Sequence, residues 1–500
     1  MLLASAFVFA ASMTLYVATL APGLLWGGGD FARFQTWAYL GHIEGKVDIF
    51  AHPLWVYAAH PFTWLPIRDP AWRANLASAV FASLALVFVF LSASHLTRSR
   101  PAALLATATL AVSHTFWTYA VMPKVYSLNA LLLAACIYLL LHWRASHADR
   151  FLYAFAWLYG FSFLNHLVMS TAAAGFAAFI VVTMCTVRGR GERVLPRLLV
   201  TTGWFVGGLF PYLYLVARSE AAAGTLGTIV TFLNGLLHVV GHFTTLARGC
   251  GLGVLLGLYQ FPITAVVGVV GLYQLWRSDS GVAALVTLIL IGTLAFLLSA
   301  LGPGTALTYG RDCLHYYLQA YVPFALALAV GFDAVWTRWC CHQRMRQAVV
   351  IVLTLASVPL YAAAPAIARR MVSNIPEFRS MPGRDNFRYV LSPWKQNETG
   401  ARDYGMQVLQ ALPAGSVLFA DYGPWSVIRY LQVVESLRLD VDLVQLGGGS
   451  QVADILAHGA KPALFLVDTN RYYDLAGIRQ HFDIVPAGPI YRLLPNSTPR

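Results

Sequence analysis

The sequence predicts a mainly α-helical polytopic membrane protein, with about 11 transmembrane helices and a small C-terminal α/β extracytoplasmic domain. Of the 500 residues, 58% are hydrophobic and only 11% are charged, whereas a soluble domain has about 25% charged residues. After residue 371 the long apolar runs stop, and short strand-like runs alternate with helical patterns. That alternation is typical of a small layered α/β domain.

A membrane span needs ~20 mostly apolar residues. We expect the first span to be retained, because no basic n-region with a small-residue cleavage site is evident. One apolar stretch is divided near Asn165 and His166 to give the fifth and sixth spans. The expected spans are residues 2–24, 75–96, 102–121, 126–143, 151–168, 170–187, 198–217, 252–275, 282–301, 315–336 and 347–367.

Basic residues lie in every second loop between these spans, which predicts that those loops are cytoplasmic. The N-terminus is then cytoplasmic, and the C-terminal domain is periplasmic or otherwise extracytoplasmic. The short loops favour a bacterial inner membrane. The formal net charge of +12 is spread over the short loops, so it does not indicate nucleic-acid binding. The outward loops contain Asp30, Lys124, Arg218, His238 and Arg311.

The tail is expected to form a soluble domain over residues 401–500, joined by a linker, 368–400, to the membrane domain, 1–367. The glycines at 447–449 follow a strand without a G-x-G-x-x-G pattern, so no dinucleotide site is expected. The six cysteines have neither zinc-site spacing nor a disulfide framework. Helices are expected at 401–412, 424–436 and 451–458, and strands at 416–420, 441–446 and 463–467.

The first outer loop, residues 26–73, contains the strongest candidate for chemistry. Asp30 follows three glycines at the end of the first span. An acid at the edge of a span is costly to hold in lipid, and glycines let the backbone approach a ligand closely. Such an acid can deprotonate an acceptor hydroxyl while a cation holds a phosphate leaving group. The alternative is a membrane-exit turn with an exposed acid.

Arg311 is the candidate for holding that anionic group, since a guanidinium binds phosphate in a bidentate manner. The structural alternative is an interfacial arginine that snorkels to the membrane surface. His166, near the outer end of the fifth span, is by itself more typical of a packed, hydrogen-bonded residue than of a ligand.

Several motifs occur in a defined order along most of the chain. They are APGLLWGGGD at 21–30, His52-Pro53, TFWTYAVMPKVYSLNALLL at 115–133, Gly160 with Asn165-His166-Leu167, FPYLY at 210–214, and a run at 412–446 that contains SVLFADYGPWS. In this order they resemble the transmembrane-protein-260-like family of membrane proteins, whose animal member is a protein O-mannosyltransferase of the GT-C glycosyltransferase type.

The resemblance implies a GT-C-like membrane body that moves a sugar, mannose or another hexose, from a polyprenyl-phosphate carrier to a hydroxyl of a protein or glycan acceptor. Asp30 matches the family's catalytic acid. No D-x-D pair adjoins Asp30, so no obligatory metal and no other cofactor is expected. The partners implied are the lipid-linked sugar, the acceptor and membrane lipid. Lys124 and Arg311 are then expected to bind the donor phosphate, and the site is shaped by His52, His166, Asn165, Tyr126 and Glu44.

Two positions depart from the family pattern, because Arg33 and Lys124 stand where the family has glutamate. Asp30 is therefore the only matched candidate base, although Glu44 or Asp48 could compensate. Two other hypotheses stay open. A catalytically degenerate scaffold would leave Asp30 solvated or neutralised by Arg33, whereas an enzyme would place it near Arg311. A transporter or flippase of lipid-linked solutes usually shows inverted repeats, which this sequence lacks.

Overall fold

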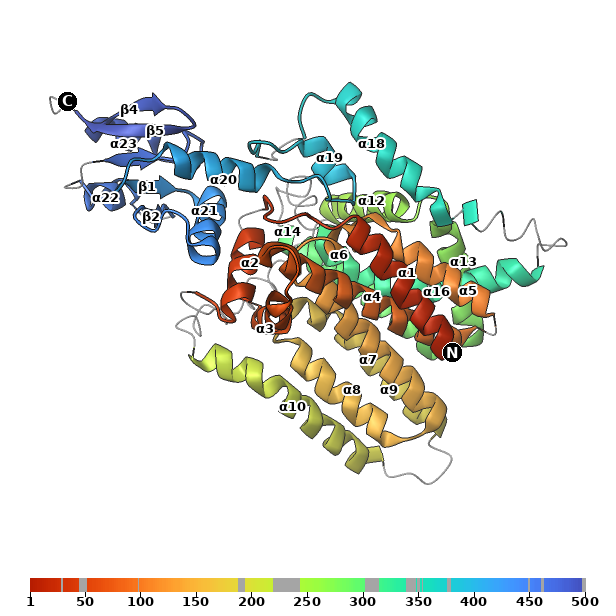
Figure 1. Cartoon of the computed structure of the whole chain (residues 1–500). Helices are drawn as coiled ribbons and strands as arrows, with labels where there is room; N and C mark the ends of the chain where they lie inside the picture. Colours follow the sequence, from red (N-terminus) through yellow and green to blue (C-terminus); the bar gives the residue numbers. More distant parts are fainter. Residues whose placement is uncertain are drawn as a thin grey trace.

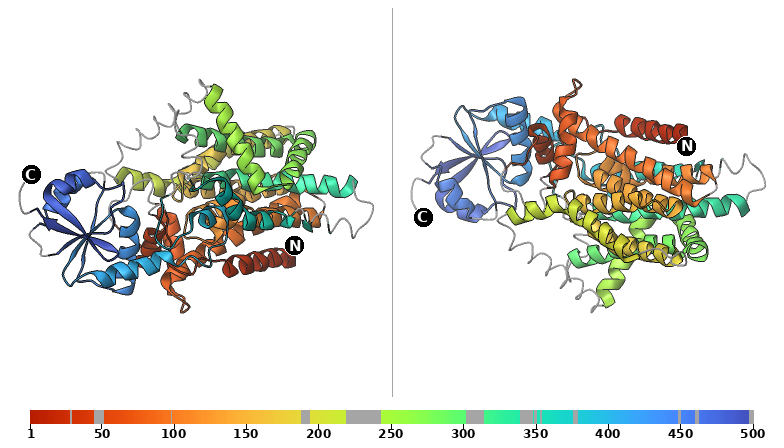
Figure 2. Two further views of the ribbon diagram at one scale, coloured as in Figure 1. Left: turned by 90° about the horizontal axis from the view of Figure 1, so that it is seen from above. Right: turned by 90° about the horizontal axis from the view of Figure 1, so that it is seen from below.

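The computed structural model describes residues 1–27, 30–44, 52–97, 99–187, 194–218, 243–301, 314–338, 348, 351–352, 354–375, 379–447, 450–459 and 463–496. In this part of the chain a body of helices carries a small sheet domain at one end (Figures 1 and 2). The N-terminus lies at the end of the body that is remote from the sheet (Figure 2).

Six of the described helical segments are long and apolar enough to cross a membrane, or seven if one bent pair is counted as a span. The chain is thus a multi-pass membrane protein. The helices of the body are α1 (Leu2–Ala18), α4 (Pro70–Leu96), α5 (Arg100–Ala111), α6 (His114–Ala120), α7 (Tyr126–Ser146), α8 (Asp149–Ser162), α9 (Ala173–Val187), α10 (Val194–Arg218), α12 (Phe243–Gln260), α13 (Thr264–Ser278), α14 (Ser280–Leu301), α16 (Leu318–Arg338) and α18 (Ser357–Met371).

The sequence predicts about 11 spans, which is more than the six or seven found among the described residues, because several apolar segments contain breaks. The segment predicted at 102–121 is divided between α5 and α6 near Ser113, whose hydroxyl bonds the Leu110 carbonyl. The segment predicted at 252–275 bends by 109° between α12 and α13. Pro262 lies in that break and lacks the backbone N–H that would continue a helix. Apolar composition alone does not reveal such interruptions.

Two further predicted spans are shorter in the structure. The first ends at Ala18, and the fifth ends at Ser162, before the short 3-10 helix η2 (Leu167–Ala172) that leads into α9. The expected division of the fifth and sixth spans near Asn165 is therefore confirmed. The last predicted span, 347–367, falls partly outside the described residues.

Glycines allow neighbouring helices of the body to approach closely. A Cβ at Gly160 of α8 would lie 2.2 Å from the Phe205 carbonyl oxygen, and one at Gly208 of α10 would lie 2.1 Å from that of Trp157. Helices in a membrane associate through such close packing, because lipid provides no hydrophobic driving force between them.

The first loop folds onto the end of α4 as α2 (Asp30–Leu40), α3 (Pro53–Ala59) and the 3-10 helix η1 (His60–Trp64). The buried amide of Gln35 anchors α2. It donates to Asn75 Oδ1 at 2.8 Å and to the Gly23 carbonyl at 3.0 Å. The beginning of α2 is thereby held at a defined position beside the first segment of the chain.

The C-terminal domain is built on a five-stranded mixed sheet in the order β2-β1-β3-β5-β4. Strand β1 is parallel to β2 and β3, whereas β5 is antiparallel to β3 and β4. Every residue of β1 and β3 is buried. The elements are α20 (Gly400–Ala411), β1 (Val417–Ala420), α21 (Tyr422–Glu435), β2 (Asp442–Gln445), α22 (Gln451–Leu456), β3 (Leu464–Leu466), α23 (Leu475–His481), β4 (Phe482–Ala487) and β5 (Ile490–Pro495).

The three strands and three helices expected in the tail are confirmed to within two residues at every end. The β4–β5 hairpin and α23 were not predicted. Within the segment expected to be a linker, the structure shows a short helix, α19 (Asn386–Leu391).

The domain is docked on the body through the first loop. Helix α21 packs along α2 (Figure 1). The Trp26 indole donates to the Pro382 carbonyl at 2.9 Å, and Arg429 of α21 pairs with Glu44 at 2.6 Å. The loop with Asp30 and the tail therefore lie against each other at one end of the body.

The contact between α8 and α10 gives a test of the close packing. Replacing Gly208 with alanine should destabilise the protein by about 1–3 kcal/mol, the usual cost of overpacking. A methyl group added at the neighbouring Gly207 would meet no atom within 4 Å, so Gly207→Ala should be neutral or stabilise through helix propensity by up to ~1 kcal/mol. The measurement is the thermal unfolding midpoint in detergent. Equal midpoints for the two variants would contradict the packing described.

Candidate functional site

Asp30 is the first residue of α2, and both of its carboxylate oxygens are hydrogen-bonded. Lys124, from the short segment between α6 and α7, donates from Nζ to Oδ2 at 2.6 Å. Tyr422, the first residue of α21, donates from its hydroxyl to Oδ1 at 3.1 Å. The N-terminus of a helix also favours a negative charge. Three distant parts of the chain thus meet at one carboxylate.

Arg33 lies one turn further along α2 and contacts the same group of residues. Its guanidinium donates to the Tyr422 hydroxyl oxygen at 2.6 Å and stacks over the Trp37 ring at 4.2 Å. Within the described part of the chain Arg33 forms no ion pair with Asp30. Arg33 therefore contacts the same tyrosine that donates to Asp30.

These contacts keep Asp30 ionised. Burial disfavours its charge, but the charge and hydrogen bond of Lys124, the hydrogen bond of Tyr422 and the charge of His52 outweigh burial and lower the pKa of Asp30. Its side chain is still 43% exposed, whereas that of Lys124 is only 13% exposed. The carboxylate is thus charged at neutral pH and accessible to a substrate.

Tyr422 keeps its proton under the same conditions. Burial and the charge of Asp30 raise the pKa of the Tyr422 hydroxyl to about 12. A protonated hydroxyl is what the hydrogen bond to an ionised carboxylate requires.

His52 is held beside this centre in a strained backbone conformation. Its φ of 52° is in the left-handed region, and it directly precedes Pro53 at the start of α3. Such strain costs of order 1–3 kcal/mol and is concentrated at functional sites. His52 Nδ1 bonds the Asn165 carbonyl at 2.7 Å, and the Asn165 amide donates to the Val125 carbonyl at 3.1 Å. These bonds connect the first loop to the segment that contains Lys124.

Aromatic rings pack around this segment. His52 stacks on His166 with 4.6 Å between ring centroids, and Tyr126 stacks on His315 at 4.3 Å. Lys124 Nζ lies 5.9 Å from the Tyr126 ring centroid. The site therefore combines the carboxylate of Asp30 with the cations Lys124 and Arg33 and a cluster of stacked rings.

The structure brings together most of the residues that the sequence suggested: Asp30, Lys124, Tyr126, His52, Asn165 and His166. Glu44 pairs with Arg429 and so connects the first loop to the C-terminal domain. Arg311 and Asp48 lie outside the described residues.

Tyr422 is the residue that the sequence analysis missed. It is 392 positions away from its partner Asp30. One feature could have indicated it: the run at 412–446 places Asp421-Tyr422 directly after a predicted buried strand, and the carboxyl ends of parallel strands are where α/β sheets present functional side chains.

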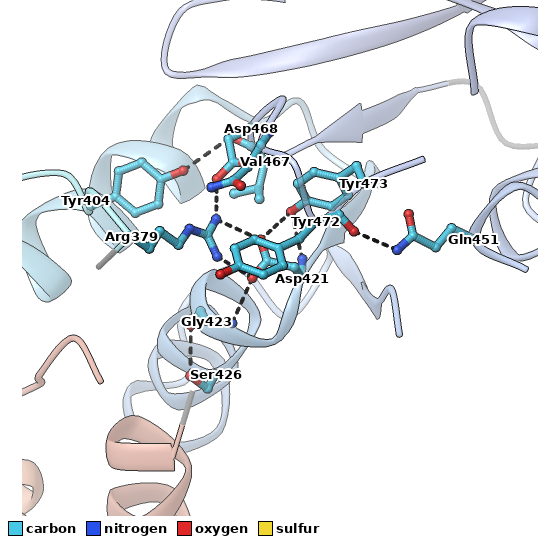
Figure 3. Close-up of polar contacts among 11 residues, drawn as sticks. Arg379, Tyr404, Asp421, Gly423, Ser426, Gln451, Val467, Asp468, Tyr472 and Tyr473 are labelled. Carbon is cyan, nitrogen blue, oxygen red and sulfur yellow. Dashed lines mark hydrogen bonds and ion pairs between the residues drawn. The ribbon is translucent and has the colours of Figure 1, made fainter. Parts of the chain in front are cut away.

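A network of ion pairs fixes the start of α21 (Figure 3). Asp421 caps the helix by accepting from the Gly423 N–H at 3.0 Å. Arg379 donates to both oxygens of Asp421, at 2.6 and 2.8 Å, and to Asp468 at 2.8 Å. The Tyr473 hydroxyl also donates to Asp421, at 2.9 Å. Asp421 directly follows the parallel strand β1, and Asp468 lies two residues after the end of β3, so the sheet itself sets their positions.

The two carboxylates hold Arg379 firmly in its charged form. Burial opposes that charge, but the hydrogen bond and charge of Asp421 and the charge of Asp468 outweigh burial and raise the pKa of Arg379. Among the described residues, no group of three or more His, Cys, Asp or Glu side chains is arranged to hold a metal ion.

Comparisons with known proteins agree with the family resemblance. The family described as "Protein O-mannosyl-transferase TMEM260 N-terminal domain" matches residues 51–188. The chain is 27% identical to mouse protein O-mannosyl-transferase TMEM260 over 235 residues, which are 46% of this chain and 33% of that protein. It is 22% identical to the Dictyostelium discoideum protein O-mannosyl-transferase tmem260 over 489 residues, 88% of this chain and 56% of that protein.

The fold is similar to two solved structures, each 12% identical in sequence. One is ArnT from Cupriavidus metallidurans bound to undecaprenyl phosphate, with a TM-score of 0.58 over 98% of this chain and 97% of that chain. The other is the Archaeoglobus fulgidus oligosaccharyltransferase tethered to an acceptor peptide, with a TM-score of 0.51 over 93% of this chain and 69% of that chain.

These findings confirm the resemblance to the transmembrane-protein-260-like O-mannosyltransferase family and a GT-C glycosyltransferase-like fold. The chain spans only 33% and 56% of the length of the two curated relatives.

The ion pair between Lys124 and Asp30 can be tested without an activity assay. Lys124→Gln should raise the pKa of Asp30 by about 1–3 units, the usual effect of losing an adjacent opposite charge. Carbodiimides label protonated carboxyls, and mass spectrometry measures the labelled fraction of Asp30. The pH at which half of Asp30 is labelled should rise by the same amount. Arg150→Gln, on the first turn of α8, serves as the charge control and should leave that pH unchanged. An unshifted value in Lys124→Gln would contradict the pairing.

Proposed function

We propose that this chain is a GT-C-type glycosyltransferase that moves a sugar, mannose or another hexose, from a polyprenyl-phosphate carrier to a hydroxyl of a protein or glycan acceptor. The observation that carries the proposal is an ionised, partly exposed Asp30 held beside Lys124 where the C-terminal domain meets the membrane body. The bound undecaprenyl phosphate of the ArnT structure and the acceptor peptide of the oligosaccharyltransferase structure support these classes of substrate.

Asp30 acts as the general base in the proposed reaction. Its carboxylate takes the proton of the acceptor hydroxyl as that oxygen forms a bond to the anomeric carbon of the sugar. The bond from this carbon to the carrier phosphate breaks at the same time, and its electron pair leaves with the phosphate. Attack from the face opposite the leaving group inverts the configuration at the anomeric carbon.

Negative charge grows on the carrier phosphate as it leaves, from one charge in the diester to two in the monoester. Lys124 is the described cation closest to Asp30, at 2.6 Å, and its flexible ammonium suits a phosphate. A donor phosphate that attracts Lys124 would also weaken the ion pair with Asp30, which makes the carboxylate a stronger base. Arg311 is proposed as a second phosphate ligand from the sequence alone.

The aromatic cluster is proposed to shape the sugar-binding part of the site. Tyr126 lies beside Lys124 and contacts His166, which stacks on His52, and Asn165 holds His52 in place. Flat rings pack against the apolar face of a ligand at low entropy cost, because they have few rotatable bonds.

One feature near Asp30 supports an enzyme over a degenerate scaffold. The scaffold hypothesis expects Arg33 to neutralise this carboxylate, but Arg33 bonds Tyr422 instead. The short loops favour a bacterial inner membrane, and the loop charges favour an orientation with the N-terminus cytoplasmic and with Asp30 and the C-terminal domain on the periplasmic side.

The direct test measures sugar transfer from radiolabelled polyprenyl-phosphate-mannose in membranes that contain the wild type or Asp30→Asn. Loss of a general base should lower the transfer rate by about 10²–10⁴-fold at unchanged expression. Asp483→Asn is the matched control, since this acid is exposed on β4 in the C-terminal domain, and its transfer rate should equal that of the wild type.

Two other outcomes would change the proposed role of Asp30 or the proposed function. Equal transfer by wild type and Asp30→Asn would remove Asp30 from the mechanism and direct attention to Glu44 and Asp48. Absence of transfer by the wild type with mannose, glucose and arabinose donors would favour the scaffold or transporter hypothesis.

A further inference from the structure

We infer that Tyr422 of the C-terminal domain is a positioning residue for Asp30, so that the soluble domain completes the catalytic centre. This inference rests on the proposed function of Asp30 as the base. It assigns a role in the reaction to the C-terminal domain.

The direction of each hydrogen bond follows from the chemistry of the three groups. A guanidinium only donates, so Arg33 must donate to the Tyr422 oxygen across 2.6 Å. An ionised carboxylate only accepts, so the single hydroxyl hydrogen of Tyr422 must point to Asp30 Oδ1, at 3.1 Å. Arg33 occupies a lone pair of the tyrosine oxygen and thereby directs the hydrogen toward the base.

The two hydrogen bonds restrict Asp30 to one orientation. Tyr422 holds Oδ1, and Lys124 holds Oδ2 at 2.6 Å. An ionised carboxylate has about four lone-pair sites, so sites remain for the proton of an acceptor hydroxyl. If Lys124 moves to a donor phosphate, Tyr422 is the described partner that keeps the carboxylate aligned.

The C-terminal domain places Tyr422 through its sheet. Strand β1 ends at Ala420, Asp421 caps α21, and Tyr422 is the next residue. Arg379 clamps Asp421 to Asp468, which follows β3 (Figure 3). The network in Figure 3 therefore fixes the backbone from which Tyr422 reaches Asp30.

This arrangement explains why an arginine suits position 33. A glutamate at position 33 would accept the Tyr422 hydrogen and draw it away from Asp30, whereas the arginine donates and leaves it for the base. The basic residue at this position is then part of the positioning machinery.

The decisive variant is Tyr422→Phe, which keeps the ring and removes the hydroxyl. Losing a hydrogen bond to a charged carboxylate should raise the pKa of Asp30 by about one unit. The acid limb of the kcat–pH profile should move up by the same amount, with kcat lower by about tenfold near neutral pH and KM within about twofold. Tyr491→Phe, on strand β5 of the same domain, should match the wild type. A merely structural role for Tyr422 would lower the yield of folded protein and leave the pH profile in place.

Carbodiimide labelling of Asp30 separates this inference from the proposed function, because it needs no turnover. A raised labelling pH in Tyr422→Phe, found together with no sugar transfer by the wild type, would support the hydrogen bond and reject the glycosyltransferase. An unchanged labelling pH in Tyr422→Phe would overturn the inference even if Asp30→Asn abolishes transfer.

A second variant covers the case in which Tyr422→Phe does not fold. Arg33→Gln should raise the labelling pH of Asp30 in the same direction, because an amide can accept the Tyr422 hydrogen. If both variants fold, the double variant should shift no further than Tyr422→Phe alone, since Arg33 acts through the tyrosine. Additive shifts would show that Arg33 acts on Asp30 independently and would overturn the proposed order of the contacts.

Discussion

The contact between α2 and α21 is the constraint on which the rest of the site depends. It joins the first loop to a domain that follows the last helix of the body, and it brings Tyr422 to Asp30 and Arg429 to Glu44. The body contributes a cation to the same place through Lys124. An isolated acid at a membrane surface would be an ordinary solvated charge. Lys124 and Tyr422, from two distant parts of the chain, instead keep it ionised and hold it in one orientation.

Each side of this contact is stabilised separately. On the membrane side, the buried amide of Gln35 bonds Asn75 and the backbone of Gly23, which holds α2 at the end of α4. On the domain side, Arg379 joins the acids that follow β1 and β3. Buried charges are retained at a cost unless they are paired and hydrogen-bonded, and here the pairing defines where α21 begins.

The sequence predicted a mainly helical membrane body, three strands of the tail sheet and Asp30 as the candidate acid, because each has a local pattern. Long apolar runs indicate spans, SVLFA indicates a buried strand, and WGGGD marks an acid at a membrane edge. The number of spans could not be predicted, since breaks near Ser113 and Pro262 depend on local hydrogen bonding and backbone chemistry. Tyr422 could not be predicted because only the docked domain brings it to Asp30. In the sequence alone Arg33 indicates a lost acid, whereas in the structure it bonds that tyrosine.

The separation of 392 residues between Asp30 and Tyr422 also has a consequence for biosynthesis. A ribosome makes the N-terminal part first, so the acid is already in the membrane while most of the chain is unfinished. Its full set of hydrogen-bond partners forms only after the tail has been made and folded against the first loop. A truncated or stalled product therefore has the acid without its alignment, and completion of the chain is coupled to assembly of the centre.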